Sequence, residues 1–215
     1  LDEIFRYFHA SKIGGGIHCI NERARVERCW VHNCLRGITV NGRDTYATIR
    51  DCHIYNNIGD GIHVGGGPHT RITGNAIYNN GNADKRYVSC GAGIFFCFGN
   101  KGLIITDNYI YENRVGIGAI NIGSMEKDEA SDTRTLINNN MIYRNDYAAV
   151  TSNTGGSNEQ GPWNIMLCDN MIFNNHQSRD GRVFAWANDL PAALVLRNAR
   201  GCVVANNRIF DDQDA

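Results

Sequence analysis

The sequence lacks a charge bias and a long apolar run. Its 21 Lys and Arg residues nearly balance its 22 Asp and Glu residues, which leaves a formal net charge of −1. A chain this close to neutral has no general attraction for nucleic acid or for an anionic membrane. No apolar run reaches the length of a membrane span, and no secretory leader is visible. We therefore expect neither nucleic acid nor a membrane as a partner.

Signals for metal binding are also missing. The chain has 8 cysteines, but they form no Cys-x-x-Cys pair with a matching second pair. A zinc site is therefore not expected. No compact group of carboxylates has the form of a calcium cage, so calcium is not indicated either. The sequence predicts no metal ligand and no cofactor.

A repeat runs through the whole chain. Each copy has an apolar residue with Asn or Cys two positions before it and Asn, Cys or Asp three positions after it. Successive copies are 23, 23, 33, 32, 30 and 37 residues apart. This pattern predicts a solenoid with a basic coil of about 22 residues and insertions in the later coils. The repeated apolar residues are Val31, Ile54, Ile77, Ile110, Ile142, Ile172 and Ile209.

Each coil contains short segments in which apolar residues alternate with others. One segment holds Ile49, Cys52 and Ile54, and a second opens with Gly61-Ile62. A spacing of two predicts strands. Strands that recur once per coil stack in parallel about 4.8 Å apart, so seven coils form a rod about 34 Å long. An Asn at each inward corner can satisfy the backbone groups there by bonding to its neighbours above and below.

This repeat resembles the right-handed parallel β-helix of the pectin-lyase-like superfamily. The pattern I-x-x-N-x-I-x-x-N followed by G-I carries the resemblance, which covers nearly all of the chain. It implies an all-β solenoid of about seven coils, with Asn and Cys ladders and loop insertions in the later coils. We expect residues 1–215 to form a single parallel β-helix domain, with residues 1–13 as a cap or as a partial coil of a longer β-helix.

The resemblance also implies a carbohydrate-active protein. Mannuronan epimerases and related alginate lyases on this scaffold carry an Asp-Pro-His-Asp motif. Pro68-His69 is similar to the centre of that motif, but Gly67 and Thr70 stand where both acids should be. No catalytic residue is therefore carried over from the family, and the scaffold alone does not specify the chemistry.

Three cysteines occupy positions that other coils give to asparagine. Cys29 and Cys52 stand two places before the repeated apolar residue, and Cys34 stands three places after it. Cysteine is small and readily buried. We expect a stack of structural thiols here rather than disulfides or a metal site.

The second strand of each coil carries the first candidates for substrate contact. Alternation places His18, Thr39, His63 and Phe95 outward in consecutive coils. The two imidazoles are then two rungs, or about 10 Å, apart. We expect His18, Thr39 and Phe95 to contact the substrate.

Further candidates surround these strands: Arg43, Asp44, Asp60, His69 and Lys101. Abstraction of a proton next to a uronate carboxylate needs a base, a cation and an acid. His63 or His69 would be the base, because histidine serves this role at neutral pH. Arg43 or Lys101 would be the cation, and Asp44 or Asp60 the acid. Plain solvent-facing polar residues are the alternative interpretation.

Acidic residues in the inserted loops suggest a different chemistry. They are Glu126, Asp128, Glu129, Asp132 and Glu159. If the loops lean over the strands, two of these carboxylates can act as acid and base on a glycosidic bond, with Trp163 as a sugar platform. An ordinary solvated polar loop explains the same residues.

The first strand of each coil has an apolar outward stripe. Three explanations apply: contact within a homo-oligomer such as a trimer, stacked surface aromatics, or a platform for sugars. The stripe consists of Trp30, His32, His53, Tyr55, Ala76, Tyr78, Tyr109, Tyr111, Met141, Tyr143, Met171, Phe173, Arg208 and Phe210.

These observations predict a protein that binds polysaccharide. The first hypothesis is a lyase or epimerase of an acidic polysaccharide. A non-catalytic glycan-binding fibre, similar to a tailspike segment, is the alternative, and a glycoside hydrolase is a weaker one. The compartment stays open, since loss of a leader or an upstream segment would make the protein extracellular or virion-associated.

Overall fold

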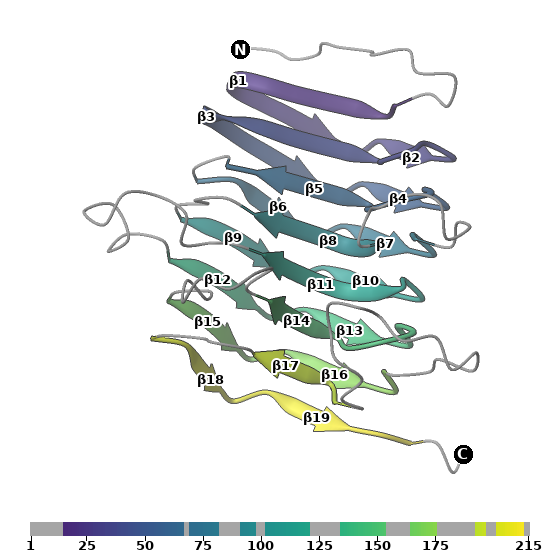
Figure 1. Ribbon diagram of the computed structural model, residues 1–215, viewed down its shortest axis with the longest axis vertical. Helices are drawn as coiled ribbons and strands as arrows, with labels where there is room; N and C mark the ends of the chain where they lie inside the picture. Colours follow the sequence, from purple (N-terminus) through teal and green to yellow (C-terminus); the bar gives the residue numbers. More distant parts are fainter. Residues whose placement is uncertain are drawn as a thin grey trace.

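The chain forms a stack of coils built from strands. The computed structural model describes residues 15–66, 69–81, 91–97, 102–120, 134–153, 164–175, 192–196 and 201–212. Within these ranges all regular elements are strands, and they follow one another along a single axis from β1 to β19 (Figure 1). Every coil adds its strands in parallel to those of the coil before it. The predicted all-β solenoid of about seven coils is confirmed.

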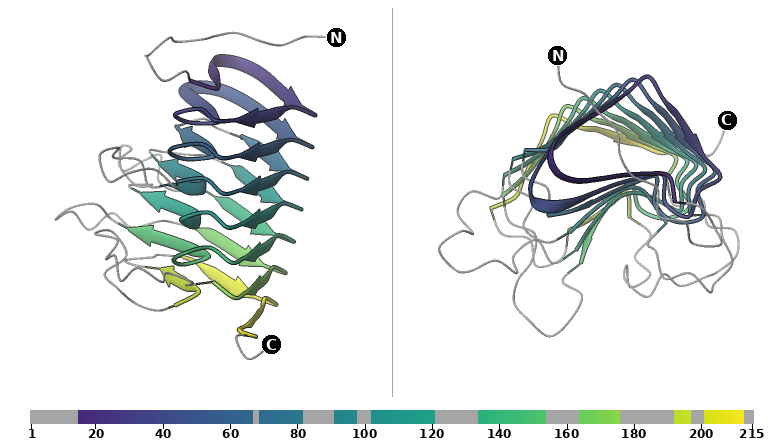
Figure 2. Two further views of the ribbon diagram at one scale, coloured as in Figure 1. Left: turned by 90° about the vertical axis from the view of Figure 1, so that its right-hand side faces the viewer. Right: turned by 90° about the horizontal axis from the view of Figure 1, so that it is seen from above.

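The coil has three faces. Strands pair into a 12-stranded sheet and a 7-stranded sheet. The larger sheet contains two faces, because β1 and β3 run together across a corner, and β3 pairs with β5 before the corner and with β6 after it. Seen along the axis, successive coils lie over one another with their corners aligned (Figure 2).

Face 1 contains the strands of the Gly-Ile pattern and their counterparts in the last two coils. They are the first parts of β1 (Ile17–Glu27) and β3 (Ile38–Arg50), followed by β5 (Ile62–Gly65), β8 (Ala92–Cys97), β11 (Val115–Ile120), β14 (Val150–Asn153) and β17 (Leu194–Leu196). Face 2 contains the second parts of β1 and β3, followed by β6 (Arg71–Thr73), β9 (Leu103–Thr106), β12 (Thr135–Asn138), β15 (Ile165–Cys168) and β18 (Val203–Ala205).

Face 3 is the 7-stranded sheet. It contains β2 (Trp30–His32), β4 (His53–Tyr55), β7 (Ala76–Tyr78), β10 (Tyr109–Tyr111), β13 (Met141–Tyr143), β16 (Met171–Phe173) and β19 (Arg208–Phe210).

Corner residues with a left-handed backbone conformation split a segment that the sequence pattern predicted as one strand. The pattern placed Ile49, Cys52 and Ile54 on one strand, but β3 ends at Arg50 and β4 begins at His53. Between them Asp51 has a φ of 54°. Such a residue breaks the extended backbone and turns the chain onto the next face. The coil therefore has three strands where two were predicted.

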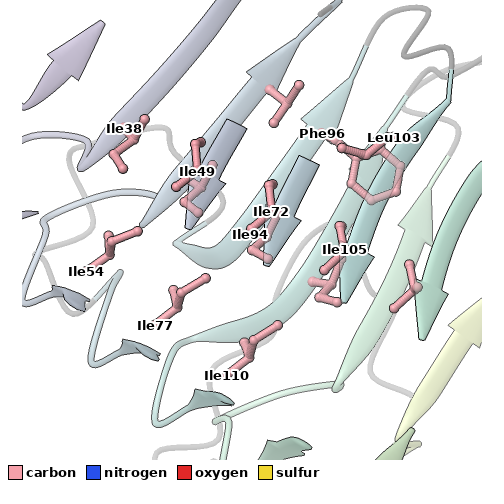
Figure 3. Close-up of a cluster of buried hydrophobic side chains, with 14 of the residues drawn as sticks. Ile38, Ile49, Ile54, Ile72, Ile77, Ile94, Phe96, Leu103, Ile105 and Ile110 are labelled. Atoms are coloured by element: carbon pink, nitrogen blue, oxygen red, sulfur yellow. The ribbon is translucent and has the colours of Figure 1, made fainter. Parts of the chain in front are cut away.

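The core is a set of isoleucine columns (Figure 3). The repeated apolar residue is fully buried from Ile54 to Ile172, whereas Ile209 in the last coil is 47% exposed. Ile49, Ile72 and Ile105 form the column under face 2, and they meet the face 3 column inside the coil. Each coil thus covers the apolar side chains of its neighbours, which supplies one continuous core along the rod.

Two asparagine ladders follow the corners on either side of face 3. In the first ladder Asn108 donates through Nδ2 to the carbonyls of Ile72 at 3.0 Å and Thr106 at 2.9 Å, and to Oδ1 of Asn140 at 2.9 Å. Its own Oδ1 accepts the backbone N–H of Asn75 at 3.0 Å. The predicted ladder is confirmed, and it satisfies backbone groups that the corners leave unpaired.

The cysteines continue the ladders without disulfides in the part of the chain that is described. Seven cysteines there are free thiols. Cys52 is buried, and its sulfur accepts the backbone N–H of Cys29 at 3.5 Å. The backbone N–H of Cys34 donates to Asn57 at 3.0 Å. These residues occupy the ladder positions, as the sequence predicted.

Some predicted features fall outside the described residues. They are the cap or partial coil at residues 1–13 and most of the inserted loops, which include the acidic residues 126–132 and Glu159. The described strands on either side show where those loops are inserted: residues 121–133 and 154–163 both connect face 1 to face 2. Among described residues, no helix is long and apolar enough to cross a membrane.

The outward stripe of face 3 forms a stack of rings. The ring centroids of successive coils are 4.8 to 5.2 Å apart, with interplanar angles from 1° to 16°. The faces of the inner rings are therefore covered by their neighbours. Burial raises the pKa of Tyr111 to about 12. The stacked rings are His32, Tyr55, Tyr78, Tyr111, Tyr143, Phe173 and Phe210.

Candidate functional site

The register of face 1 places the predicted side chains in one column. His18 of β1 pairs with Thr39 of β3, which pairs with His63 of β5, which pairs with Phe95 of β8. His18 and His63 are thus two rungs apart, as the sequence predicted. The next outward positions along the same strands hold Asn41, Gly65 and Cys97.

His63 forms a hydrogen-bonded pair with Asp60. Nδ1 of His63 lies 3.0 Å from Oδ2 of Asp60, three residues earlier at the corner that leads into β5. The side chain of Asp60 is only 1% exposed, and that of His63 is 12% exposed. A carboxyl group buried this deeply needs partners. The other oxygen of Asp60 accepts the backbone N–H of Ala92 at 3.1 Å.

The pair determines which ring nitrogen of His63 is available. A carboxylate can only accept a hydrogen bond, so Nδ1 carries a hydrogen and donates it to Asp60. In the neutral ring Nε2 is then the acceptor. Asp60 therefore holds His63 in the tautomer and orientation that a general base requires.

The thiol of Cys97 lies beside this nitrogen. Its sulfur is 3.9 Å from Nε2 of His63. Burial is the largest cause that raises the pKa of Cys97 to about 12, and the nearby charge of Asp60 adds to it while Arg36 opposes it. Cys97 is accordingly a neutral thiol at physiological pH.

Arg36 supplies positive charge next to the pair. Its Nε lies 3.9 Å from Oδ2 of Asp60, and its side chain is 40% exposed. Arg36 and Asp60 lie in neighbouring coils at equivalent positions, because the backbone of Gly37, which follows Arg36, is hydrogen-bonded to the coil of Asp60 and Gly61. A half-exposed guanidinium can contact Asp60 and still offer N–H groups to an anionic ligand.

A glycine leaves space next to His63. A Cβ at Gly65 would lie 3.8 Å from Nε2 of His63 and would collide with Oδ1 of Asn41. The amide of Asn41 in turn lies 3.2 Å from Nε2 of His18. Asn41 therefore contacts His18, and the absence of a side chain at Gly65 makes room for its amide.

Phe95 lies in a closed apolar cluster rather than in an open platform. Phe95 is 6% exposed and packs with Ala92, Cys97, Val115 and Tyr147. Its ring is tilted by 32° to that of His63, with centroids 5.1 Å apart. It contacts the candidate base directly, but a ring this buried offers little surface for a sugar.

The remaining candidates lie apart from this group or outside the described residues. His69 is at the corner before β6 and stacks on Tyr46 of β3, with ring centroids 5.6 Å apart, on the outer side of face 2. Arg43 and Asp44 belong to β3, but their side chains are not described. Lys101 and Trp163 lie outside the described residues.

Three residues of the site were not anticipated from the sequence: Arg36, Asn41 and Cys97. Each had a signal in the repeat. Arg36 stands two places before Ile38 as Asp60 stands before Ile62, while Asn41 and Cys97 follow the predicted outward residues by two. Extending the alternation by one step would have identified Asn41 and Cys97, and the repeat position of Asp60 would have identified Arg36.

The described residues do not suggest a metal centre. Among them, no group of three or more His, Cys, Asp and Glu side chains is placed to hold an ion. What the arrangement offers is an oriented imidazole, a buried carboxyl group and a cation, all on one face of the stack.

The fold and this site define a parallel β-helix protein with polar chemistry on one outer face. A family model described as the right-handed beta helix region matches residues 4–159. The match covers 156 of the 215 residues, so the chain belongs to the right-handed β-helix family. Carbohydrate-active proteins are common in that family. A search of curated proteins finds no match to the chain.

Proposed function

We propose that this protein acts on an acidic polysaccharide as a lyase or an epimerase, with His63 as the base. The observation that carries the proposal is the hydrogen bond from Nδ1 of His63 to the buried Asp60. It holds Nε2 ready to accept a proton, while the ring stays on the outer side of face 1.

The first chemical step is removal of the proton on the carbon next to a uronate carboxylate. The C–H electron pair moves into the carboxylate to form an enolate-like intermediate, and a nearby cation lowers the cost of the second negative charge. Arg36 is the cation that the described residues place closest to the pair. Arg43 and Lys101 remain candidates for the same role.

The second step separates the two reactions. In a lyase the electron pair returns to form a carbon–carbon double bond, and the glycosidic oxygen on the neighbouring carbon leaves with a proton. In an epimerase a proton is returned to the opposite face of the same carbon. Both begin at His63, so both depend on the His63–Asp60 pair.

The test is the ultraviolet absorbance of the unsaturated uronate on alginate, pectate, hyaluronan and chondroitin. An epimerase forms no unsaturated product, so the quantity measured for it is the exchange of the substrate proton for deuterium from deuterated water. We expect His63→Ala to lower the rate by at least about 100-fold and Asp60→Asn by about 10-fold or more. His69→Ala is the comparison variant, because His69 is the other candidate base and lies on the outer side of face 2; this variant should keep most of the activity.

A different pattern would refute the proposal. If His63→Ala keeps full activity while His69→Ala loses it, the base is on face 2. If wild type produces no unsaturated ends, no reducing ends and no proton exchange on any polymer, catalysis is absent.

Glycan binding without cleavage is the second candidate, and one observation favours it. The side chain of His63 is only 12% exposed, and Nε2 already faces Cys97. A base this enclosed has restricted access to a polymer. Binding of the same polysaccharides without any chemical change would establish this alternative.

A further inference from the structure

The outer surface of face 2 is rich in arginine in the first three coils. Five exposed arginines form what we call the arginine patch: Arg23, Arg25, Arg28, Arg50 and Arg71. The inward positions between them, such as Val26, Ile49 and Ile72, are buried. Alternation along β1, β3 and β6 therefore directs the strand arginines outward, while Arg28 lies at the corner that follows β1.

The register brings these arginines close together. Arg25 pairs with Thr48, and Thr48 pairs with Arg71, so the two arginines stand two rungs, or about 10 Å, apart in one column. Glu27 pairs with Arg50 in the adjacent column. The patch thus spans neighbouring positions in three successive coils.

Positive charge exceeds negative charge across the patch. Among the described side chains, the acids beside it are Glu27 and the exposed Asp51. Glu27 forms ion pairs with two of the arginines, because its Oε1 lies 3.1 Å from Nε of Arg25 and 3.0 Å from Nε of Arg50. Its hydrogen bond with Arg50 is the largest cause that lowers its pKa, so Glu27 stays ionised at neutral pH. Among the described side chains, five arginines against two acids leave a surplus of three positive charges.

Several of these arginines are available to a ligand. Among the side chains that the structure describes, none forms an ion pair with Arg23, Arg28 or Arg71. An exposed guanidinium offers a planar fork of N–H groups that matches a carboxylate or a sulfate. The stacked pair of Tyr46 and His69 borders the patch on the side toward face 1. Tyr46 is itself exposed and can contact the apolar side of a sugar ring.

We infer that the arginine patch binds an acidic polysaccharide. The choice of ligand rests on the proposed function, but the surface is distinct from the one that carries His63. The patch lies around the corner from β5, since His69 follows Gly65 by only four residues. A bound polymer can therefore extend from the patch toward face 1. The near-neutral net charge of the chain disfavours nucleic acid as the partner.

The test measures binding without turnover. Labelled polygalacturonate is titrated with His63→Ala protein at low salt, and fluorescence anisotropy gives the Kd. Introducing Arg23→Gln and Arg71→Gln together into the His63→Ala protein should raise the Kd by about 10-fold or more. Added salt should weaken the binding of polygalacturonate to the protein that keeps all five arginines. The matched control, Arg144→Gln with Arg208→Gln, removes the same charge elsewhere and should change the Kd by no more than about twofold. Unchanged thermal unfolding shows that both variants fold.

The outcomes separate this inference from the proposed function. Binding that depends on Arg23 and Arg71 supports the patch even where wild type shows no catalysis. If both double variants weaken binding equally, the effect comes from the total charge of the protein and not from the arginine patch, and the inference is overturned. It also fails if polygalacturonate does not bind, or if single-stranded DNA of equal charge binds the patch as tightly.

Discussion

Burial sets the acid–base state of individual cysteines. It raises the pKa of Cys19 and Cys52 to about 11 and that of Cys97 to about 12. An exposed thiol in the unfolded chain ionises near pH 8.5. The folded state therefore resists losing these protons, whereas the unfolded state does not.

This difference predicts a loss of stability in alkali. A raised folded-state pKa contributes stability that is complete below about pH 8.5 and is lost as the pH rises toward about 11. Denaturant unfolding should show a free energy that is lower at about pH 10 than at about pH 7, by about 1–2 kcal/mol for each buried thiol. Cys97→Ala should show a smaller decrease than wild type. An identical decrease in both proteins would contradict the role given to this thiol.

At the scale of structural elements, the asparagine ladder joins each corner to the next. Asn108 is 1% exposed and satisfies the Ile72 and Thr106 carbonyls and the Asn75 backbone N–H. Such groups have no access to water inside the corner, so loss of the side chain leaves several of them unpaired.

Asn108→Ala should therefore lower the free energy of unfolding by about 3 kcal/mol or more. Asn139→Gly is the matched control. Asn139 is the exposed corner residue before Asn140, with a φ of 54°, a conformation that glycine adopts freely. The control should change stability by less than about 1 kcal/mol. Urea unfolding measures both variants, and similar losses in the two would show that the ladder is not the source of stability.

On the scale of the whole molecule, face 3 remains the expected oligomer contact. The stacked rings cover one another's faces, which leaves little ring surface for a flat sugar. The neighbouring outward column includes Trp30 at 69% exposure and Tyr109 at 52% exposure. Exposed aromatic side chains next to a long apolar stack favour association with another copy over a solvated surface.

We predict a homo-oligomer, such as a trimer, that weakens when these two side chains are removed. Sedimentation analysis over a range of concentrations should show the assembly for wild type. For Trp30→Ser with Tyr109→Ser it should show dissociation at concentrations about 10-fold higher or more. Tyr46→Ser removes an exposed aromatic from face 2 and should leave the assembly unchanged. A wild-type protein that is monomeric at every concentration would exclude the contact.

The repeat alone determined that this protein is a solenoid of stacked parallel coils. Asn75, Asn108 and Asn140 recur beside buried isoleucines, and only a stack of parallel coils places such residues in register. The outward column from His18 through His63 to Phe95 followed from alternation for the same reason. These features depend on local spacing, which the sequence displays directly.

Only the tertiary structure decided how those residues combine. The left-handed corner at Asp51 created a third face, so His69 lies on the outer side of face 2 while His63 lies on face 1. The approach of Cys97 to His63 joins residues 34 positions apart. Spacing along the chain does not specify such contacts, because insertions of different length separate neighbouring coils and the corner geometry sets which side chains meet.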